Sequence, residues 1–180
     1  LLYYLNKKFK NINFHGVDVM PGLINLAKKK LPSKIKLKKL DFNKKQIIKK
    51  KYDIIICSGV ISIFDNLDVI MKNIKQSFAK DSFLYFFGSF NEYDFDTRVA
   101  YKDLNSKTKN FQSGWNLWSI KTIQSYFKKK IIKYPFEIKI NVKKNKKDFM
   151  RSWTVKVNNK LRFTNAISLM QNQMWLEIKK

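Results

Sequence analysis

Residues 13–30 read NFHGVDVMPGLINLAKKK and contain the clearest strand–helix pattern of the chain. Its apolar part predicts a strand over residues 14–19 that carries an acidic residue, Asp18, close to its end. An amphipathic helix is predicted directly afterwards, over residues 21–30, because a proline suits the first turn of a helix. The ionised carboxylate of Asp18 offers two acceptor oxygens and no donor. The stretch therefore predicts a strand–helix unit that presents a hydrogen-bond acceptor at the end of its strand.

Strand and helix patterns alternate along most of the remaining chain. The runs YDIIICS (52–58) and FLYFFGS (83–89) are almost continuously apolar, which is typical of parallel strands buried on both faces. Alternating strands and helices favour βαβ units, so we predict an α/β fold with a Rossmann-like, doubly wound and mostly parallel sheet. The other predicted elements are a strand at residues 35–40 and helices at residues 1–9, 66–78 and 119–129.

The C-terminal third predicts strands of a different kind. Residues 136–142 alternate as FEIKINV, and residues 174–178 read MWLEI, so each predicts a further strand. Between them, WTVKV and KLRFT flank Asn158 and Asn159. Because asparagine tolerates a positive φ, this pattern predicts a two-residue β-hairpin inserted before the last strand.

The chain carries a formal charge of +25, from 38 basic and 13 acidic residues. Such an excess suits a nucleic acid or another anionic surface. Nearly all the basic residues are lysines, however, whereas the arginine guanidinium is the favoured group for phosphate recognition. We therefore interpret the charge mainly as a solvated lysine-rich surface, with a phosphate-tracking patch as the alternative.

The length of 180 residues predicts one domain with a sizeable core, spanning residues 1–180. No run reaches the roughly 18 apolar residues of a membrane-spanning helix, and we expect a cytoplasmic protein. The single cysteine, Cys57, falls in an apolar strand and is interpreted as a small buried hydrophobe. The single histidine, His15, is interpreted as a core residue rather than a general base. We expect no metal site.

The unit at residues 13–30 resembles the second strand and following helix of the class I S-adenosylmethionine-dependent methyltransferases. This resemblance implies S-adenosylmethionine as the cofactor and an antiparallel last strand. It also implies that Asp18 binds the ribose and that Val19 and Met20 pack on the adenosine; the alternative for Asp18 is a helix cap or loop carboxylate. In that family a glycine-rich loop lies about one helix upstream. This sequence opens at Leu1, so we expect an N-terminally truncated domain that lacks the first strand and the glycine loop.

The resemblance implies cofactor contacts at two further strand ends. Asp41 would accept a hydrogen bond from the adenine amino group, and Phe42 would stack on the ring. The alternative is that Asp41 caps a helix beginning near Asn43. Ser58 and Gly59 would contact the methionine part of the cofactor, because a glycine lets the backbone approach a ligand closely.

On the acceptor side, the resemblance favours loop residues beyond the later strands. The alternative is loop packing for Ser62 and Phe64 and core packing for Trp115. Methyl transfer from a sulfonium needs mainly positioning and exclusion of water, so we assign no catalytic residue. The expected substrate contacts are Ser62, Phe64, Arg98, Tyr101 and Trp115.

The predicted function is S-adenosylmethionine-dependent methyl transfer to a small-molecule or glycan-type acceptor, with this stretch alone inactive. A nucleic-acid acceptor is disfavoured, because the loop after residues 52–58 lacks the Asp/Asn-Pro-Pro-aromatic motif of the base amino-methyltransferases. The main alternative is a non-catalytic Rossmann-like module that binds RNA or an anionic surface through its lysines. A nicotinamide-dependent oxidoreductase, which also allows an acidic residue after the second strand, ranks third.

Overall fold

The computed structural model describes residues 1–105, 110–148, 150–167 and 169–180. The chain divides into two compact units, residues 1–46 and residues 47–180. The single domain over residues 1–180 stays a prediction. Among the described residues, no helix is long and apolar enough to cross a bilayer.

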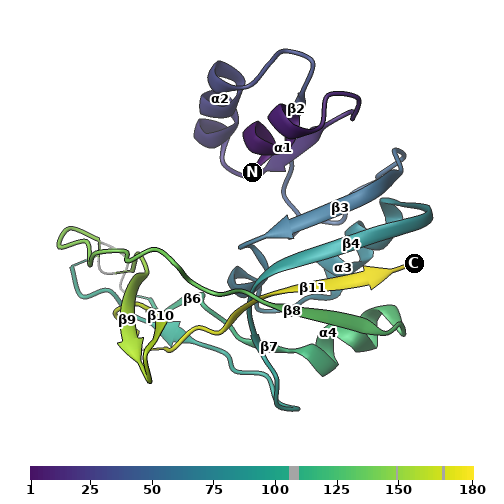
Figure 1. Ribbon diagram of the computed structural model, residues 1–180. Helices are drawn as coiled ribbons and strands as arrows, with labels where there is room; N and C mark the ends of the chain where they lie inside the picture. The colour runs from purple at the N-terminus through teal and green to yellow at the C-terminus, as the bar shows by residue number, and fades with distance from the viewer. Residues whose placement is uncertain (106–109, 149, 168) are drawn as a thin grey trace. The chain divides into compact units, whose positions relative to one another are not determined.

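The first unit pairs two short parallel strands with two helices (Figure 1). The strands run in register from His15 opposite Lys36 to Asp18 opposite Lys39, which confirms both predicted strands in shortened form. A Cβ atom at Gly16 would lie 2.7 Å from the Leu2 side chain, so only glycine lets this side chain lie so close to the strand. The elements are α1 (Leu2–Lys8), β1 (His15–Asp18), α2 (Pro21–Lys30) and β2 (Lys36–Lys39).

The second unit is built around a mixed sheet with the strand order β3-β4-β11-β8 (Figure 1). Strands β3 and β4 are parallel, whereas β11 runs antiparallel to both β4 and β8. This arrangement confirms the Rossmann-like α/β class and the antiparallel last strand. The elements are β3 (Tyr52–Ser58), the 3-10 helix η1 (Ile61–Ile63), α3 (Asp68–Gln76), β4 (Phe78–Asn91), β5 (Ala100–Tyr101), β6 (Gln112–Ser113), β7 (Trp118–Ser119), α4 (Ile120–Phe127), β8 (Ile131–Pro135), β9 (Trp153–Val157), β10 (Lys160–Thr164) and β11 (Gln173–Lys179).

The inserted hairpin is confirmed. Strands β9 and β10 pair antiparallel, with Lys160 opposite Val157. The two turn residues, Asn158 and Asn159, have φ values of 48° and 60°. Both angles lie in the left-handed region that two-residue hairpin turns require and that asparagine tolerates.

The strand predicted at residues 136–142 is wrong. The partner positions along β11 are taken by residues 131–135, and Pro135 opposite Met174 is the last pair. Beyond Pro135 the alternating apolar residues do not pack against a core, since Ile140 is 73% exposed. A hydrophobic alternation forms a strand only where a neighbouring strand and a core receive it.

The expectation that the central strands are buried on both faces is also wrong, because Ile54 of β3 is 54% exposed. On β4, alternate residues such as Leu84 and Phe86 are completely buried, and their neighbours are half-buried. Helix α4 covers the buried face, where the Phe127 ring lies 6.3 Å from that of Phe86. Lys75 of α3 reaches the same Phe127 ring, so both helices cover one face of the sheet.

The single cysteine lies on β3, an edge strand of this sheet, and is half-buried. Cys57 belongs to β3, opposite Phe86 of β4, and burial raises the pKa of its thiol to about 12. A thiol with so high a pKa carries almost no thiolate at neutral pH, and the thiolate is the reactive form. This environment supports the interpretation of Cys57 as a small hydrophobe.

Candidate functional site

Two carboxylates lie at the same edge of the first unit. Asp18 is the last residue of β1, and Asp41 follows β2 by two positions. The strands are parallel, and the Leu40 N–H donates to the Asp18 carbonyl at 2.9 Å. Both side chains therefore belong to the carboxyl edge of this strand pair, where open α/β sheets bind their ligands.

The Asp18 carboxylate is oriented by its own loop. Its Oδ1 accepts a hydrogen bond from the Met20 N–H at 2.8 Å, and the side chain is half-buried. Helix α2 has Met20 as its N-cap and no side-chain cap, so Asp18 closes a turn and does not cap the helix. Among the described residues, nothing donates to its Oδ2. Next to it, Val19 and Met20 are 45% and 57% exposed, as apolar contacts for a ligand would be.

Asp41 also closes a turn. Its Oδ1 accepts from the Asn43 N–H at 2.9 Å, and its carbonyl accepts from Gln46 Nε2 at 2.8 Å. No helix begins here, so the alternative that Asp41 caps a helix near Asn43 is wrong. An aspartate that bonds the N–H two residues ahead offers the backbone a turn in place of a helix. Phe42, the predicted stacking residue, is half-buried.

In the second unit, the loop after β3 begins with an exposed Ser58 and Gly59. Gly59 has a φ of 70°, and its N–H donates to the Phe87 carbonyl at 2.8 Å. A Cβ atom at this position would meet nothing within 4 Å, so glycine is required by its conformation and the space beside it is open. The cofactor contacts of Ser58 and Gly59 stay a prediction.

A buried asparagine ties this loop to a distant segment of the second unit. Asn116 is fully buried; its N–H donates to the Ser62 carbonyl at 2.8 Å and its Nδ2 to the Phe64 carbonyl at 2.9 Å. Its Oδ1 accepts from the Val99 N–H at 2.8 Å. These bonds bring together the chain segments that carry all five predicted acceptor contacts, Ser62, Phe64, Arg98, Tyr101 and Trp115.

The five acceptor candidates differ in what they present. Phe64 is 6% exposed, so its ring packs in the core and favours the loop-packing alternative. The Arg98 side chain is 62% exposed, and the Tyr101 hydroxyl donates to Gln112 Oε1 at 3.4 Å. Trp115 adopts a φ of 63°, which is unfavourable for so large a side chain. Such strain persists only where surrounding contacts impose it, and it is concentrated at functional sites.

Asp65 is the centre of the same network and was missed by the sequence analysis. Its Oδ1 accepts from the Ser113 hydroxyl and from Asn116 Nδ2, and it pairs with Arg98 at 3.3 Å. Ser113 and Asn116 lie 48 and 51 positions away in sequence, so no local sequence pattern predicts their hydrogen bonds to Asp65. The hydrogen bonds from Ser113 and Asn116, aided by the Arg98 charge, lower the pKa of Asp65 below its ordinary value.

Replacing Ser113 by alanine should raise the pKa of the Asp65 carboxyl toward its ordinary value, because the Ser113 hydroxyl is the largest cause of the depression. A carboxyl whose pKa is depressed by folding contributes stability above its unfolded pKa and loses it as the pH falls through the folded pKa. Carbon-13 NMR titration of the Asp65 carboxyl measures the shift. Ser125→Ala is the control, because the Ser125 hydroxyl donates to the Thr122 carbonyl instead. An unchanged Asp65 pKa in Ser113→Ala would contradict this account.

The comparison with protein families agrees with the positions of Asp18, Asp41 and the loop after β3. Residues 1–84 match the family model of the methyltransferase domain, and this span includes both strand-end carboxylates and the loop after β3. A comparison with curated proteins found no match.

Solved structures share the fold. A methyltransferase from Methanosarcina mazei has a TM-score of 0.57 and 9% identity, over 92% of this chain and 81% of its own. A glycopeptide N-methyltransferase complexed with S-adenosylmethionine has a TM-score of 0.55 and 8% identity, over 98% of this chain and 74% of its own. Coclaurine N-methyltransferase, bound to N-methylheliamine and SAH, has a TM-score of 0.55 and 14% identity over 76% of this chain. This chain spans 41% of the length of coclaurine N-methyltransferase.

The fold is the Rossmann-like α/β fold of these methyltransferase structures, with two carboxylates at the ends of its first two strands. The match of residues 1–84 to the methyltransferase domain model agrees with this fold and supports a class I S-adenosylmethionine-dependent methyltransferase. The resemblance stated from residues 13–30 is thereby confirmed.

Proposed function

We propose that this protein transfers a methyl group from S-adenosylmethionine and that the carboxyl edge of β1 and β2 binds the adenosine part of this cofactor. The observation that carries the proposal is Asp18, whose Oδ1 is held by the Met20 N–H while Oδ2 accepts no hydrogen bond from the described residues. A carboxylate fixed through one oxygen is oriented before a ligand arrives, and its remaining acceptor capacity suits the two ribose hydroxyls.

The other residues of this edge fit the same ligand. Val19 and Met20 are exposed apolar side chains beside Asp18, and adenine is a flat apolar ring system that such side chains can cover. The Asp41 carboxylate uses one oxygen for the Asn43 N–H and retains acceptor capacity for the adenine amino group. Phe42 is the neighbouring aromatic contact.

Bound S-adenosylmethionine supplies a methyl group that its sulfonium has already activated. The protein then has to orient an acceptor and exclude water, for which rigid positioning matters more than a general base. In this proposal the Asp65 network orients the acceptor. Asn116 and Ser113 hold the loop that contains the strained Trp115, and the exposed guanidinium of Arg98 is bound to the same carboxylate.

For the acceptor, we propose a small molecule or a glycan-type compound. One of the similar structures, coclaurine N-methyltransferase, has N-methylheliamine bound, and another is a glycopeptide N-methyltransferase. Trp115 and Tyr101 are flat side chains of the kind that line such sites, and Arg98 adds recognition of an anionic or hydroxylated group.

Radiolabelled methyl transfer tests the function. The natural full-length protein is incubated with labelled S-adenosylmethionine and pools of amines, phenols, sugars and short peptides, and both label transfer and SAH formation are measured. We expect transfer to at least one small-molecule or sugar pool, together with calorimetric binding of the cofactor. Absence of cofactor binding would refute the proposal, and transfer only to nucleic acid would refute the acceptor class.

A further inference from the structure

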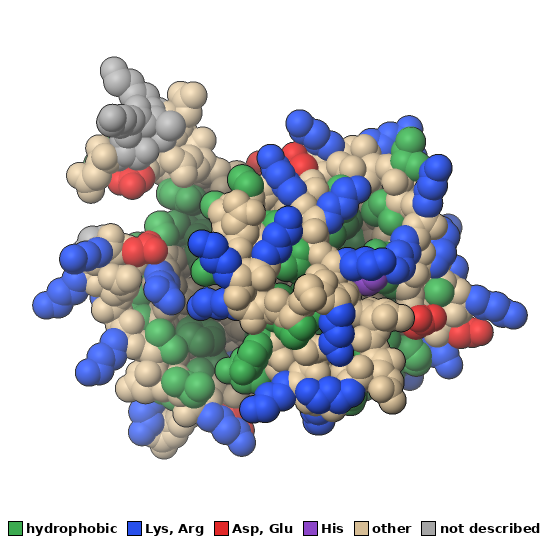
Figure 2. All heavy atoms as spheres, turned by 90° about the horizontal axis from the view of Figure 1, so that it is seen from above, with side chains coloured by type: hydrophobic (Ala, Val, Ile, Leu, Met, Phe, Trp, Pro, Cys, Tyr) green, Lys and Arg blue, Asp and Glu red, His purple; other side chains and the backbone are tan. Residues whose placement is uncertain are grey.

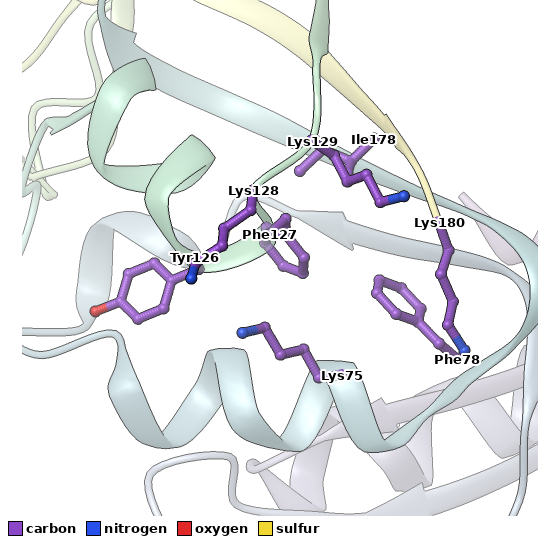
Figure 3. A pocket seen from close by; sticks show the side chains of 8 residues that line it. All are labelled: Lys75, Phe78, Tyr126, Phe127, Lys128, Lys129, Ile178 and Lys180. Carbon is purple, nitrogen blue, oxygen red and sulfur yellow. The ribbon is translucent and has the colours of Figure 1, made fainter.

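A basic hollow lies at the end of the second unit that is opposite Ser58 and Gly59. Along β3 and β4 the pairing runs from Tyr52 opposite Phe78 to Ser58 opposite Phe87, so Phe78 marks the far edge of the sheet. The hollow at this edge has a volume of about 280 Å³. Figure 3 shows its lining, which comes from the ends of α3, α4, β4 and β11: Lys75, Phe78, Tyr126, Phe127, Lys128, Lys129, Ile178 and Lys180.

A second hollow adjoins the first and shares Lys129 and Lys180 with it. Its volume is about 290 Å³, and its only acidic lining residue is Glu177. Among the described residues, none of the lysines of the two hollows forms an ion pair with a carboxylate. We call these lysines the lysine edge: Lys75, Lys128, Lys129, Lys130, Lys179 and Lys180.

Local structure explains why some of these lysines are here but not why six of them converge. Lys75 lies in the last turn of α3, and Lys128 is the C-cap of α4 with a φ of 52°; helix C-termini attract cations. The nearby Asp68 carboxylate accepts from the Tyr126 hydroxyl at 2.8 Å and is not paired with a lysine. Six like charges around two adjoining hollows repel one another, and an anion relieves that repulsion.

We propose that the lysine edge binds the phosphate backbone of a single-stranded nucleic acid. Two adjoining hollows with shared lysines suit a ligand that carries several phosphates in a row. The lysine ammonium is a point charge and lacks the bidentate donor geometry by which arginine recognises bases and phosphate groups. Binding is therefore expected to be independent of the nucleotide sequence. Within the second unit, the lysine edge lies at the opposite end of β3 and β4 from Ser58 and Gly59, and the inference does not depend on the proposed methyl transfer.

An anionic membrane fits these hollows less well. Binding at a bilayer surface gains from apolar side chains that enter the headgroup region. Phe78 and Ile178 are 7% and 1% exposed, so they are already in the core. Ile132 of the second hollow is 44% exposed, and one such side chain gives a bilayer little apolar surface to bind. Basic side chains are spread over the face shown in Figure 2, as on a solvated lysine-rich surface.

The test uses fluorescence anisotropy of labelled oligouridylate and oligothymidylate on the natural full-length protein, over a series of salt concentrations. The variant is Lys75→Gln combined with Lys129→Gln. The matched control, Lys143→Gln combined with Lys146→Gln, removes the same charge from exposed positions that do not line either hollow. Thermal melts establish that both variants fold.

We expect both oligonucleotides to bind and the Lys75/Lys129 variant to bind about tenfold more weakly. The slope of log affinity against log salt should become shallower by about 0.7 for each phosphate contact removed. The control pair should stay close to the unmodified protein. Equal losses in both pairs would show only diffuse charge and overturn the proposal. Binding restricted to pyrophosphate, or to vesicles containing anionic lipid, would overturn it as well.

Discussion

Replacing Asp18 by alanine should weaken S-adenosylmethionine binding by about 10- to 100-fold in the natural full-length protein, measured by calorimetric titration. Hydrogen bonds to a charged acceptor contribute about 1.5–3 kcal/mol, and tenfold in affinity corresponds to about 1.4 kcal/mol. Asp18→Asn is the sharper variant, because its amide oxygen can still accept from the Met20 N–H that holds Oδ1. It removes the charge and one acceptor, and we expect a loss of about tenfold.

Asp103→Ala is the matched control for the local turn. Asp103 Oδ1 accepts from the Asn105 N–H at 2.9 Å, which is the same hydrogen bond two residues ahead that Asp18 makes. Its removal should leave cofactor affinity unchanged. If Asp18→Asn and Asp18→Ala bind S-adenosylmethionine as tightly as the unmodified protein, Asp18 does not bind the ribose and the proposed site is wrong.

Replacing Phe86 by alanine should lower the free energy of unfolding by about 3–5 kcal/mol, the range for truncating a buried aromatic side chain. Phe86 is completely buried in β4, opposite Cys57 of β3 and Leu176 of β11. Its ring also lies 6.3 Å from the Phe127 ring, so its loss opens a cavity between the sheet and α4. Urea denaturation followed by circular dichroism measures the change.

Phe111→Ala is the control for this prediction, since Phe111 is 72% exposed. A substitution at so exposed a site should change stability by at most about 0.5 kcal/mol. Should Phe86→Ala and Phe111→Ala show the same midpoint and the same slope, the Phe86 ring is not a core residue and the assignment of the buried sheet face is wrong.

The elements that local sequence specifies strongly were predicted well. Helix α2 has the predicted bounds, because Pro21 suits its first turn and the apolar residues after it follow a helical spacing. The β9–β10 hairpin was also predicted, because two asparagines in succession specify the turn without any tertiary contact. By contrast, residues 136–142 alternate like a strand but have no partner, and β11 pairs with Ile131–Pro135 instead. Pairing partners are decided by the sheet and not by the segment itself.

Local sequence was enough to predict the α/β class, the positions of Asp18 and Asp41 at the ends of consecutive strands, and the glycine in the loop after β3. These features follow from hydrophobic period, turn chemistry and chain order, which are local properties. Only the tertiary structure decided that Asp65, Ser113 and Asn116 form one network, and that lysines from three separate elements surround the same two hollows. The physical reason is that hydrogen bonds and charge clusters depend on distances of a few ångströms between side chains far apart in the chain, and folding alone sets those distances.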